Sequence, residues 1–274
     1  MDAAGKINRM AAAVAVATVL AVAVQVALGS EGLARLVFEG YVLPMAGWLL
    51  FLGAAVGLHE AGHFAAARLM GLQVTSFRIG FGPEIVGRAD GSGTRWSLGA
   101  VPFGGMVSPV VPDTLGLGGR LALSLSGPLA NFVVAVALGL LYAFAYRGFG
   151  FLHGIELLGK VMLSQAMGFV DWAVRAATLD VTALSAMSSP VHVAETMGKA
   201  VSGGFWAACL SLMKLNMAVG LFNLLPVLPL DGGQAVADVV DRLVGPSRSG
   251  KARMLLAVVG ASFLTAVFAF SFVL

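Results

Sequence analysis

A run of residues without a charge, from Tyr41 to Leu58, leads directly into the sequence HEAGH at His59 to His63. An apolar run of this length is long enough to cross a bilayer as a helix. Residues four apart on a helix share one face, so His59 and His63 lie one turn apart with Glu60 beside them. The chain therefore has to fold so that two imidazoles and a carboxylate are accommodated at membrane depth.

The spacing of these ionisable residues is that of a zinc-hydrolase site, in which two histidines bind the metal and a glutamate stands beside it. The alternative is a pair of hydrogen-bonded histidines in a helix core. Ionisable side chains inside a membrane are costly to bury without a partner, so such a cluster favours a functional site. Two of the four histidines are in this motif, and the others, His153 and His192, have no paired ligand nearby in sequence. We therefore expect Zn²⁺ to bind at His59 and His63.

The composition indicates the fold class. Of the 274 residues, 58% are hydrophobic and only 11% are charged, and the mean hydropathy is +0.91. A soluble domain does not carry so little charge, so we expect an all-α polytopic membrane protein with about five to six transmembrane helices in the lipid bilayer. The net charge of +3 gives no indication of nucleic-acid binding, and the single Cys209 allows no intramolecular disulfide.

Residues 1–40 are expected to form an additional N-terminal transmembrane helix and an outer loop. The apolar run at residues 10–29 follows Lys6 and Arg9 and is long enough to span a membrane. A cleaved signal peptide is the alternative, with residues 27–29 as a poor cleavage site. We favour a retained helix because the run is longer than the apolar region of a usual signal peptide.

A β-hairpin is expected at residues 73–107. Apolar and polar side chains alternate around Phe77 and Ile79 and again around Trp96, and residues 90–93 read DGSG, which is a hairpin turn signal. Non-helical backbone is tolerated at membrane depth where it is covered by protein or lines a wet cavity. The hairpin directly follows the HEAGH helix, so it can dip into the protein interior at this depth.

The remaining chain is divided into further helices and breaks. We expect one core over residues 41–235, containing a helix at 120–146, an outer-side segment at 147–202 and a helix at 203–226 that ends in a break at PLDGG, followed at 236–274 by an amphipathic helix and a C-terminal transmembrane helix. Pro226 and Pro229 prevent a regular helix at the break, and the glycines after Asp231 free the backbone. The break is expected to present the Asp231 carboxylate at a fixed point.

The basic residues predict the orientation in the membrane. If the amino terminus is cytoplasmic, most of the lysines and arginines fall on inner segments, as the positive-inside rule requires. This orientation places the inner end of the HEAGH helix and the PLDGG break on the same, cytoplasmic side, which a shared metal ion requires. The usage of Ala, Gly, Val and Arg suggests a bacterium, so we expect the inner (plasma) membrane.

A third metal ligand is expected at Asp231. A catalytic zinc usually takes three protein ligands and keeps one position for water. Asp231 is the carboxylate at the helix break on the correct side, whereas Asp238 and Asp241 lie on the polar face of the following helix. Zinc lowers the pKa of water that it binds to ~7, so Glu60 can take the proton and pass it to a leaving amine. These residues together predict peptide-bond hydrolysis.

Four motifs resemble, in order, those of the site-2 protease family of intramembrane zinc metalloproteases. They are HEAGH at 59–63, FRIGFGPEIVG with the following TRWSLGAVPFGG at 77–105, SGPLANF at 126–132 and FNLLPVLPLDGG at 222–233. The resemblance implies that His59, His63 and Asp231 bind zinc. It also implies that Glu60 is the general base and that the hairpin is the family's membrane re-entrant β-loop.

The resemblance further implies the substrate, a membrane-spanning helix, often of a regulatory protein that another protease has already shortened. A helix hides its carbonyls in hydrogen bonds, so the segment to be cut has to unwind, and an edge strand of the hairpin can hold it by β-addition. Asn223 matches the family's asparagine before LLP and can grip that strand or a developing oxyanion. Asn131 also matches, as a weaker substrate-binding candidate or as a contact between helices.

Some features depart from many family members, and other interpretations compete. Residues 147–202 are too short and too apolar for the PDZ domain of many members, and we find no nucleotide-sensing domain.

Prenyl-protein processing proteases also place HExxH in a membrane, but with a glutamate as the third ligand on a later helix. The second alternative is a non-catalytic membrane scaffold or transporter with a structural or vestigial metal site, against which three ligands beside Glu60 argue.

Overall fold

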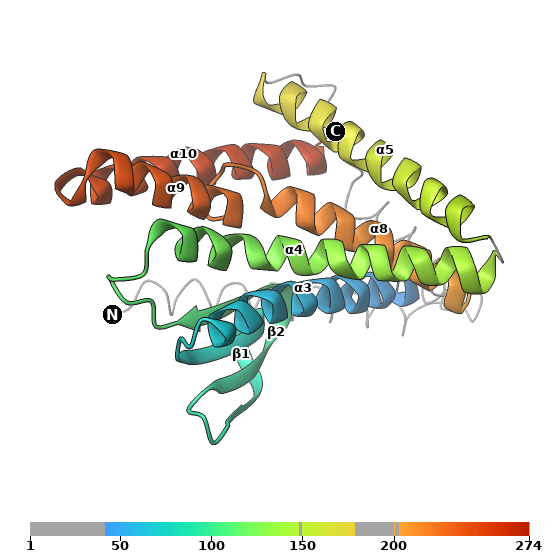
Figure 1. Cartoon of the computed structure of the whole chain (residues 1–274), viewed down its shortest axis with the longest axis horizontal. Helices are drawn as coiled ribbons and strands as arrows, with labels where there is room; N and C mark the ends of the chain where they lie inside the picture. The colour runs from blue at the N-terminus through green and yellow to red at the C-terminus, as the bar shows by residue number, and fades with distance from the viewer. Residues whose placement is uncertain (1–41, 148–149, 179–199, 201–202, 274) are drawn as a thin grey trace, which may run out of the picture.

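The structure, a computed structural model, describes residues 42–147, 150–178, 200 and 203–273. The predicted helix at residues 10–29 lies outside the described residues. The described chain is mostly helical and contains one two-stranded antiparallel sheet, as expected. Its elements, drawn in Figure 1, are α3 (Leu43–Leu69), β1 (Val74–Ala89), β2 (Arg95–Pro109), α4 (Leu117–Leu141), the π-helical turn η2 (Tyr142–Tyr146), α5 (Phe151–Ala177), α8 (Phe205–Asn223), α9 (Asp231–Val244) and α10 (Pro246–Val273).

Three of the described helical segments are long and apolar enough to cross a membrane. They are Met45–Leu69 in α3, Leu117–Tyr146 in α4 and η2, and Phe205–Asn223 in α8. α4 contacts both α3 and α8, and the three helices lie side by side in Figure 1. The predicted count of about five to six spans is not reached within the described residues. α10, where the sequence predicts a final span, is helical but is not one of the three.

Small residues let α3 and α4 approach closely. A Cβ at Gly62 of α3 would overlap the backbone oxygen of Ser126 and meet the side chain of Ala130, both in α4. Within a membrane, close packing of small residues is a main source of helix association, because water does not drive apolar helices together. This contact presses α4 against the face of α3 that carries the HEAGH motif.

The hairpin turn lies where the sequence predicts it, at residues 90–93 between the antiparallel strands β1 and β2. The indole N–H of Trp96 and the hydroxyl of Ser92 donate to the Asp90 carboxylate at 2.8 and 2.7 Å. These hydrogen bonds hold the pKa of Asp90 below its usual range, since they favour the charged carboxylate. The turn is therefore closed by an ionised side chain.

The hairpin is attached to the C-terminal half of α3. Arg68 donates to the Thr94 hydroxyl at 2.9 Å, and the Phe64 ring packs against those of Phe77 and Trp96 at centroid distances of 5.8 and 5.1 Å. Aromatic pairs at such distances add to the free energy of apolar burial. The strands are thereby held against the helix that carries the HEAGH motif.

The break between α8 and α9 covers residues 224–230. Asp231 is the first residue of α9 and does not lie in an irregular segment before it. A Cβ at Gly233 would overlap the backbone of residues 227–228. A glycine at this position lets the break fold back onto the start of the helix, which fixes where the Asp231 carboxylate points.

Arg253 of α10 binds polar side chains of α9 beyond Asp231. Its guanidinium donates to Asp238 and Asp241, both at 2.5 Å, and to Oε1 of Gln234 at 3.3 Å. Hydrogen bonds between ionised partners are the stronger kind. The two later carboxylates of α9 are therefore engaged by Arg253, whereas Asp231 faces α3.

Candidate metal centre

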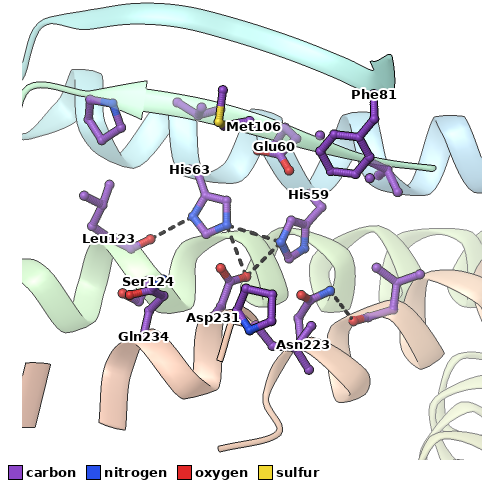
Figure 2. A pocket seen from close by; sticks show the side chains of 18 of the residues that line it. His59, Glu60, His63, Phe81, Met106, Leu123, Ser124, Asn223, Asp231 and Gln234 are labelled. Atoms are coloured by element: carbon purple, nitrogen blue, oxygen red, sulfur yellow. Dashed lines mark hydrogen bonds and ion pairs between the residues drawn. The ribbon is translucent and has the colours of Figure 1, made fainter. Parts of the chain in front are cut away.

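Three predicted ligand side chains converge between α3 and α9. Nε2 of His59 lies 2.8 Å from Oδ2 of Asp231, and Nε2 of His63 lies 3.2 Å from the same oxygen. The two Nε2 atoms are 3.2 Å apart. Figure 2 shows both imidazoles pointing from α3 toward the Asp231 carboxylate. Residues far apart in sequence thus place three donor atoms at one point.

The spacing of these atoms fits a zinc ion. Three donors on one tetrahedral Zn²⁺, each ~2.0–2.2 Å from the metal, lie about 3.3 Å from one another. The separations of 2.8 to 3.2 Å between the donors of His59, His63 and Asp231 are close to that value. Two imidazole nitrogens and a carboxylate oxygen are also donor types that zinc prefers. The residues present therefore fit the metal that the sequence predicts.

The hydrogen bonds of the imidazoles leave their Nε2 atoms available. Nδ1 of His59 lies 2.6 Å from Oδ1 of Asn131, and Nδ1 of His63 lies 2.8 Å from the backbone oxygen of Leu123. Both partners are acceptors, so each Nδ1 carries the proton and donates it. Each Nε2 then keeps its lone pair toward the point that the donors share, which is the arrangement usual for metal-ligating histidines.

α4 passes directly over the two imidazoles at Gly127. A Cβ at this position would overlap Nε2 of His63 and come within 2.6 Å of Nε2 of His59. No other residue type leaves that space open, so Gly127 is required by close packing. Gly127 belongs to the SGPLANF motif at residues 126–132.

Replacing Gly127 by alanine is expected to weaken zinc binding on the order of 10–100-fold, the loss typical when a ligating histidine is displaced from its support. The added methyl group takes the space of the Nε2 atoms, and competition with a chelator measures the change. Gly118→Ala is the matched control, because it lies on the same helix and no atom lies within 4 Å of its Cβ position. Equal losses in both variants would contradict the steric explanation.

Glu60 stands beside the three donors and is not one of them. Its side chain is buried and lies against β2. Gly105 of β2 lies so close that a Cβ there would press on Cγ and Oε1 of Glu60. The hairpin therefore fixes the carboxylate next to the cluster, at a distance that leaves the three-donor set intact.

The cluster opens into a cleft of about 540 Å³. One wall is β2, and the opposite wall is the end of α8 and the start of α9. The lining residues include Glu60, Phe81, Gly104, Gly105, Met106, Val107, Asn223, Asp231, Gln234 and Asp238. The volume lies within the range of ligand-binding clefts in proteins.

The two asparagines that the sequence singles out lie in different places. Asn223 lines the cleft, and its amide nitrogen donates to the backbone oxygen of Val219 at 3.0 Å (Figure 2). Asn131 is completely buried behind His59 and does not line the cleft. A further buried asparagine, Asn216, contacts Asn131 and has no counterpart among the sequence predictions. Its position two helical turns before Asn223 could have indicated a shared face.

Comparison with known proteins gives a family match over most of the chain. Residues 47–267 match the model of Peptidase family M50. The chain is 34% identical over 151 residues to the Agrobacterium fabrum protein "Putative zinc metalloprotease Atu1380". This alignment covers 46% of this chain and 38% of that one. It is 34% identical over 110 residues to the Escherichia coli "Regulator of sigma-E protease RseP", covering 35% of this chain and 24% of that one. The chain thus matches less than half of the length of these relatives.

Proposed function

Because this chain belongs to peptidase family M50, we propose that it is an intramembrane zinc metalloprotease. The proposed reaction is hydrolysis of a peptide bond within or next to a transmembrane helix of a membrane-bound substrate. The family and the three apolar helices make the chain an integral membrane protein. One observation carries the proposal: the three donors meet beside a buried Glu60, and two of the donors lie with Glu60 on a helix apolar enough to span a bilayer.

The residues of the cluster take distinct roles in the proposed reaction. His59, His63 and Asp231 hold the metal, which when bound supplies a Lewis acid that makes water more acidic and polarises a carbonyl. Glu60 accepts a proton from the attacking water as the water oxygen adds to the substrate carbonyl carbon. It then delivers that proton to the amide nitrogen as the carbon–nitrogen bond breaks, so a carboxyl and an amine terminus are formed.

The cleft supports β-addition of the substrate. β2 has β1 as its partner in the two-stranded sheet, and residues 104–107 of β2 line the cleft. A strand edge next to the donors can pair with an unwound segment and place one carbonyl at the metal. The hairpin also contacts α3 well inside the span, where the Ile79 side chain lies against Gly57. We therefore propose that the hairpin is membrane re-entrant.

The proposal also includes a class of substrate, an orientation in the membrane and the kind of membrane. The proposed substrate is a membrane-anchored regulator that another protease has trimmed. The name of the Escherichia coli relative, a regulator of sigma-E protease, is consistent with a regulatory role. The amino terminus and the active-site end of the core, residues 41–235, face the cytoplasm in this proposal, with the chain in a bacterial inner membrane. The alternative is a non-catalytic scaffold or transporter in which the metal is structural.

Cleavage by the purified full-length chain in proteoliposomes tests the proposed function. A membrane-anchored helical protein is co-reconstituted, and the cut is located by mass spectrometry, before and after zinc is removed with a chelator. We expect cuts within or next to the transmembrane helix that stop on chelation and return with added zinc. No cleavage by a zinc-loaded chain across a panel of single-span substrates would favour the scaffold.

Asn223→Ala is expected to lower kcat/KM by up to about tenfold if its amide holds the substrate strand, since one hydrogen bond contributes ~0.5–1.5 kcal/mol. In that case KM rises and kcat is unchanged. If the amide instead stabilises a developing oxyanion, kcat falls by ~10²–10³. Steady-state kinetics separate the two roles, and unchanged constants would remove Asn223 from the substrate site.

A further inference from the structure

Two buried asparagines lie behind the metal centre. Among the residues that the structure describes, the buried polar side chains are those of His59, Glu60, Thr94, Asn131 and Asn216. Both asparagines have no exposed surface, and each sits in a helix apolar enough to span a membrane. Buried amides away from water have to find protein partners, so their hydrogen bonds identify what they hold.

The amides form one chain of hydrogen bonds that ends on a metal ligand. Oδ1 of Asn131 accepts from Nδ1 of His59 at 2.6 Å. Its Nδ2 donates to the backbone oxygen of Ala55 at 3.0 Å and to Oδ1 of Asn216 at 2.9 Å. Nδ2 of Asn216 in turn donates to the backbone oxygen of Leu212 at 2.8 Å. The chain links α3, α4 and α8 through side chains that water does not reach.

The orientation of both amides follows from the backbone oxygen of Leu212, where the hydrogen-bond chain ends. The Leu212 oxygen only accepts, so the Asn216 amide nitrogen has to face it and the Asn216 oxygen faces Asn131. Asn131 then meets two acceptors, this oxygen and that of Ala55, which take both hydrogens of its amide. Its oxygen is left to face His59, where only a protonated Nδ1 can donate to it.

If the Asn131 amide were rotated by half a turn, His59 would have to adopt its other tautomer. The amide nitrogen would then face Nδ1 of His59, which would have to accept, and the ring proton would move to Nε2. Nε2 is the atom that lies 2.8 Å from Asp231 and faces the metal position. A protonated Nε2 cannot bind a metal ion, so the order of the amides decides whether His59 is a ligand.

We propose that Asn216 is a positioning residue that acts through Asn131 to keep Nε2 of His59 directed at the metal as an unprotonated donor. The inference rests on the proposed zinc site. It predicts that Asn216, which touches neither metal nor substrate, contributes to zinc affinity. Outer hydrogen-bond partners of metal ligands typically account for 10–100-fold in affinity.

Zinc affinity of the full-length protein in detergent, measured by competition with a chelator, tests the inference. Leucine is nearly isosteric with asparagine, so Asn216→Leu removes the acceptor without opening a cavity. We expect a loss on the order of tenfold for Asn216→Leu and at least as much for Asn131→Leu. The double variant should lose no more than Asn131→Leu alone, because both residues act along one path. Additive losses would overturn the proposal.

Asn216→Asp provides the conservative rescue. A carboxyl group buried among helices stays neutral, so its hydroxyl can donate to Leu212 while its other oxygen accepts from Asn131. We expect zinc affinity close to that of the wild type. An affinity as low as that of Asn216→Leu would contradict the hydrogen-bond explanation.

Two controls separate the inference from other failures. Met213→Ala truncates another buried side chain of α8 and is expected to lower the unfolding temperature but not zinc affinity. If it weakens zinc binding as much as Asn216→Leu, affinity merely follows stability and the proposal fails. If the wild type itself binds no zinc, the proposed function fails first. If the wild type binds zinc and Asn216→Leu binds it equally well, only this inference is overturned.

Discussion

Glu60→Gln is expected to reduce kcat by ~10²–10⁴ while zinc stays bound, the range that a general base contributes. The carboxamide has nearly the same shape as the carboxylate, so the packing of Gly105 of β2 against this side chain is kept. It cannot accept a proton from water at neutral pH, however, so the attacking water is not activated. Cleavage of a reconstituted substrate and zinc content of the same preparation measure the two effects.

Glu156→Gln is the matched control for this variant. It makes the same chemical change in an exposed side chain of α5 whose ion pair with Lys160 is on the surface. Surface ion pairs contribute little to stability, so activity should be unchanged. A scaffold or transporter does not need a base at residue 60. Normal cleavage by a zinc-loaded Glu60→Gln protein would therefore refute the catalytic role.

The parts of the site that depend on local sequence could be predicted. His59 and His63 share a face because a helix repeats every 3.6 residues, and no tertiary contact is needed to know it. The conformation of the turn at residues 90–93 is likewise determined by residues within it, since the Ser92 hydroxyl donates a hydrogen bond to the Asp90 carboxylate. Local geometry thus accounts for two of the three predicted ligands and for the hairpin.

Other parts depend on packing that the sequence does not contain. An asparagine such as Asn131 can hold a substrate, a helix or a histidine, and only the approach of α3 and α8 assigns its amide to His59 and Asn216. Glu60 is similar: its motif predicts a base, but the residue that packs against its carboxylate is Gly105 of the distant strand β2. Contacts between residues far apart in sequence therefore determine what holds His59 and Glu60 in place.

The position of Asp231 shows the same limit. The prolines and glycines around it predict a break, yet the residue begins α9. The later carboxylates of that helix have similar chemistry, and what sets them apart is Arg253, which donates to Asp238 and Asp241 from another helix. From sequence, Asp231 is chosen because it lies at the helix break on the correct side of the membrane. The structure adds that Arg253 already binds the other two carboxylates.

Asp231→Ala is expected to reduce bound zinc from about one ion per chain to near zero, since a catalytic zinc site has three protein ligands and two imidazoles are left. The loss has a further consequence, because an ion that binds the folded chain stabilises it. A chelator should therefore lower the unfolding temperature of the wild type and leave that of Asp231→Ala unchanged. Elemental analysis and thermal unfolding, each followed with helical content, measure both effects.

Asp238→Ala is the control that decides between the carboxylates of α9. It removes an acidic side chain that also lines the cleft, but one that Arg253 holds. This variant should keep its zinc and its response to the chelator. His59→Ala should behave like Asp231→Ala, because both remove a donor from one ion. If Asp231→Ala kept a full zinc complement while His59→Ala lost it, the third ligand would lie elsewhere. The contact between the HEAGH helix and the start of α9 would then be a packing contact and not a shared metal site.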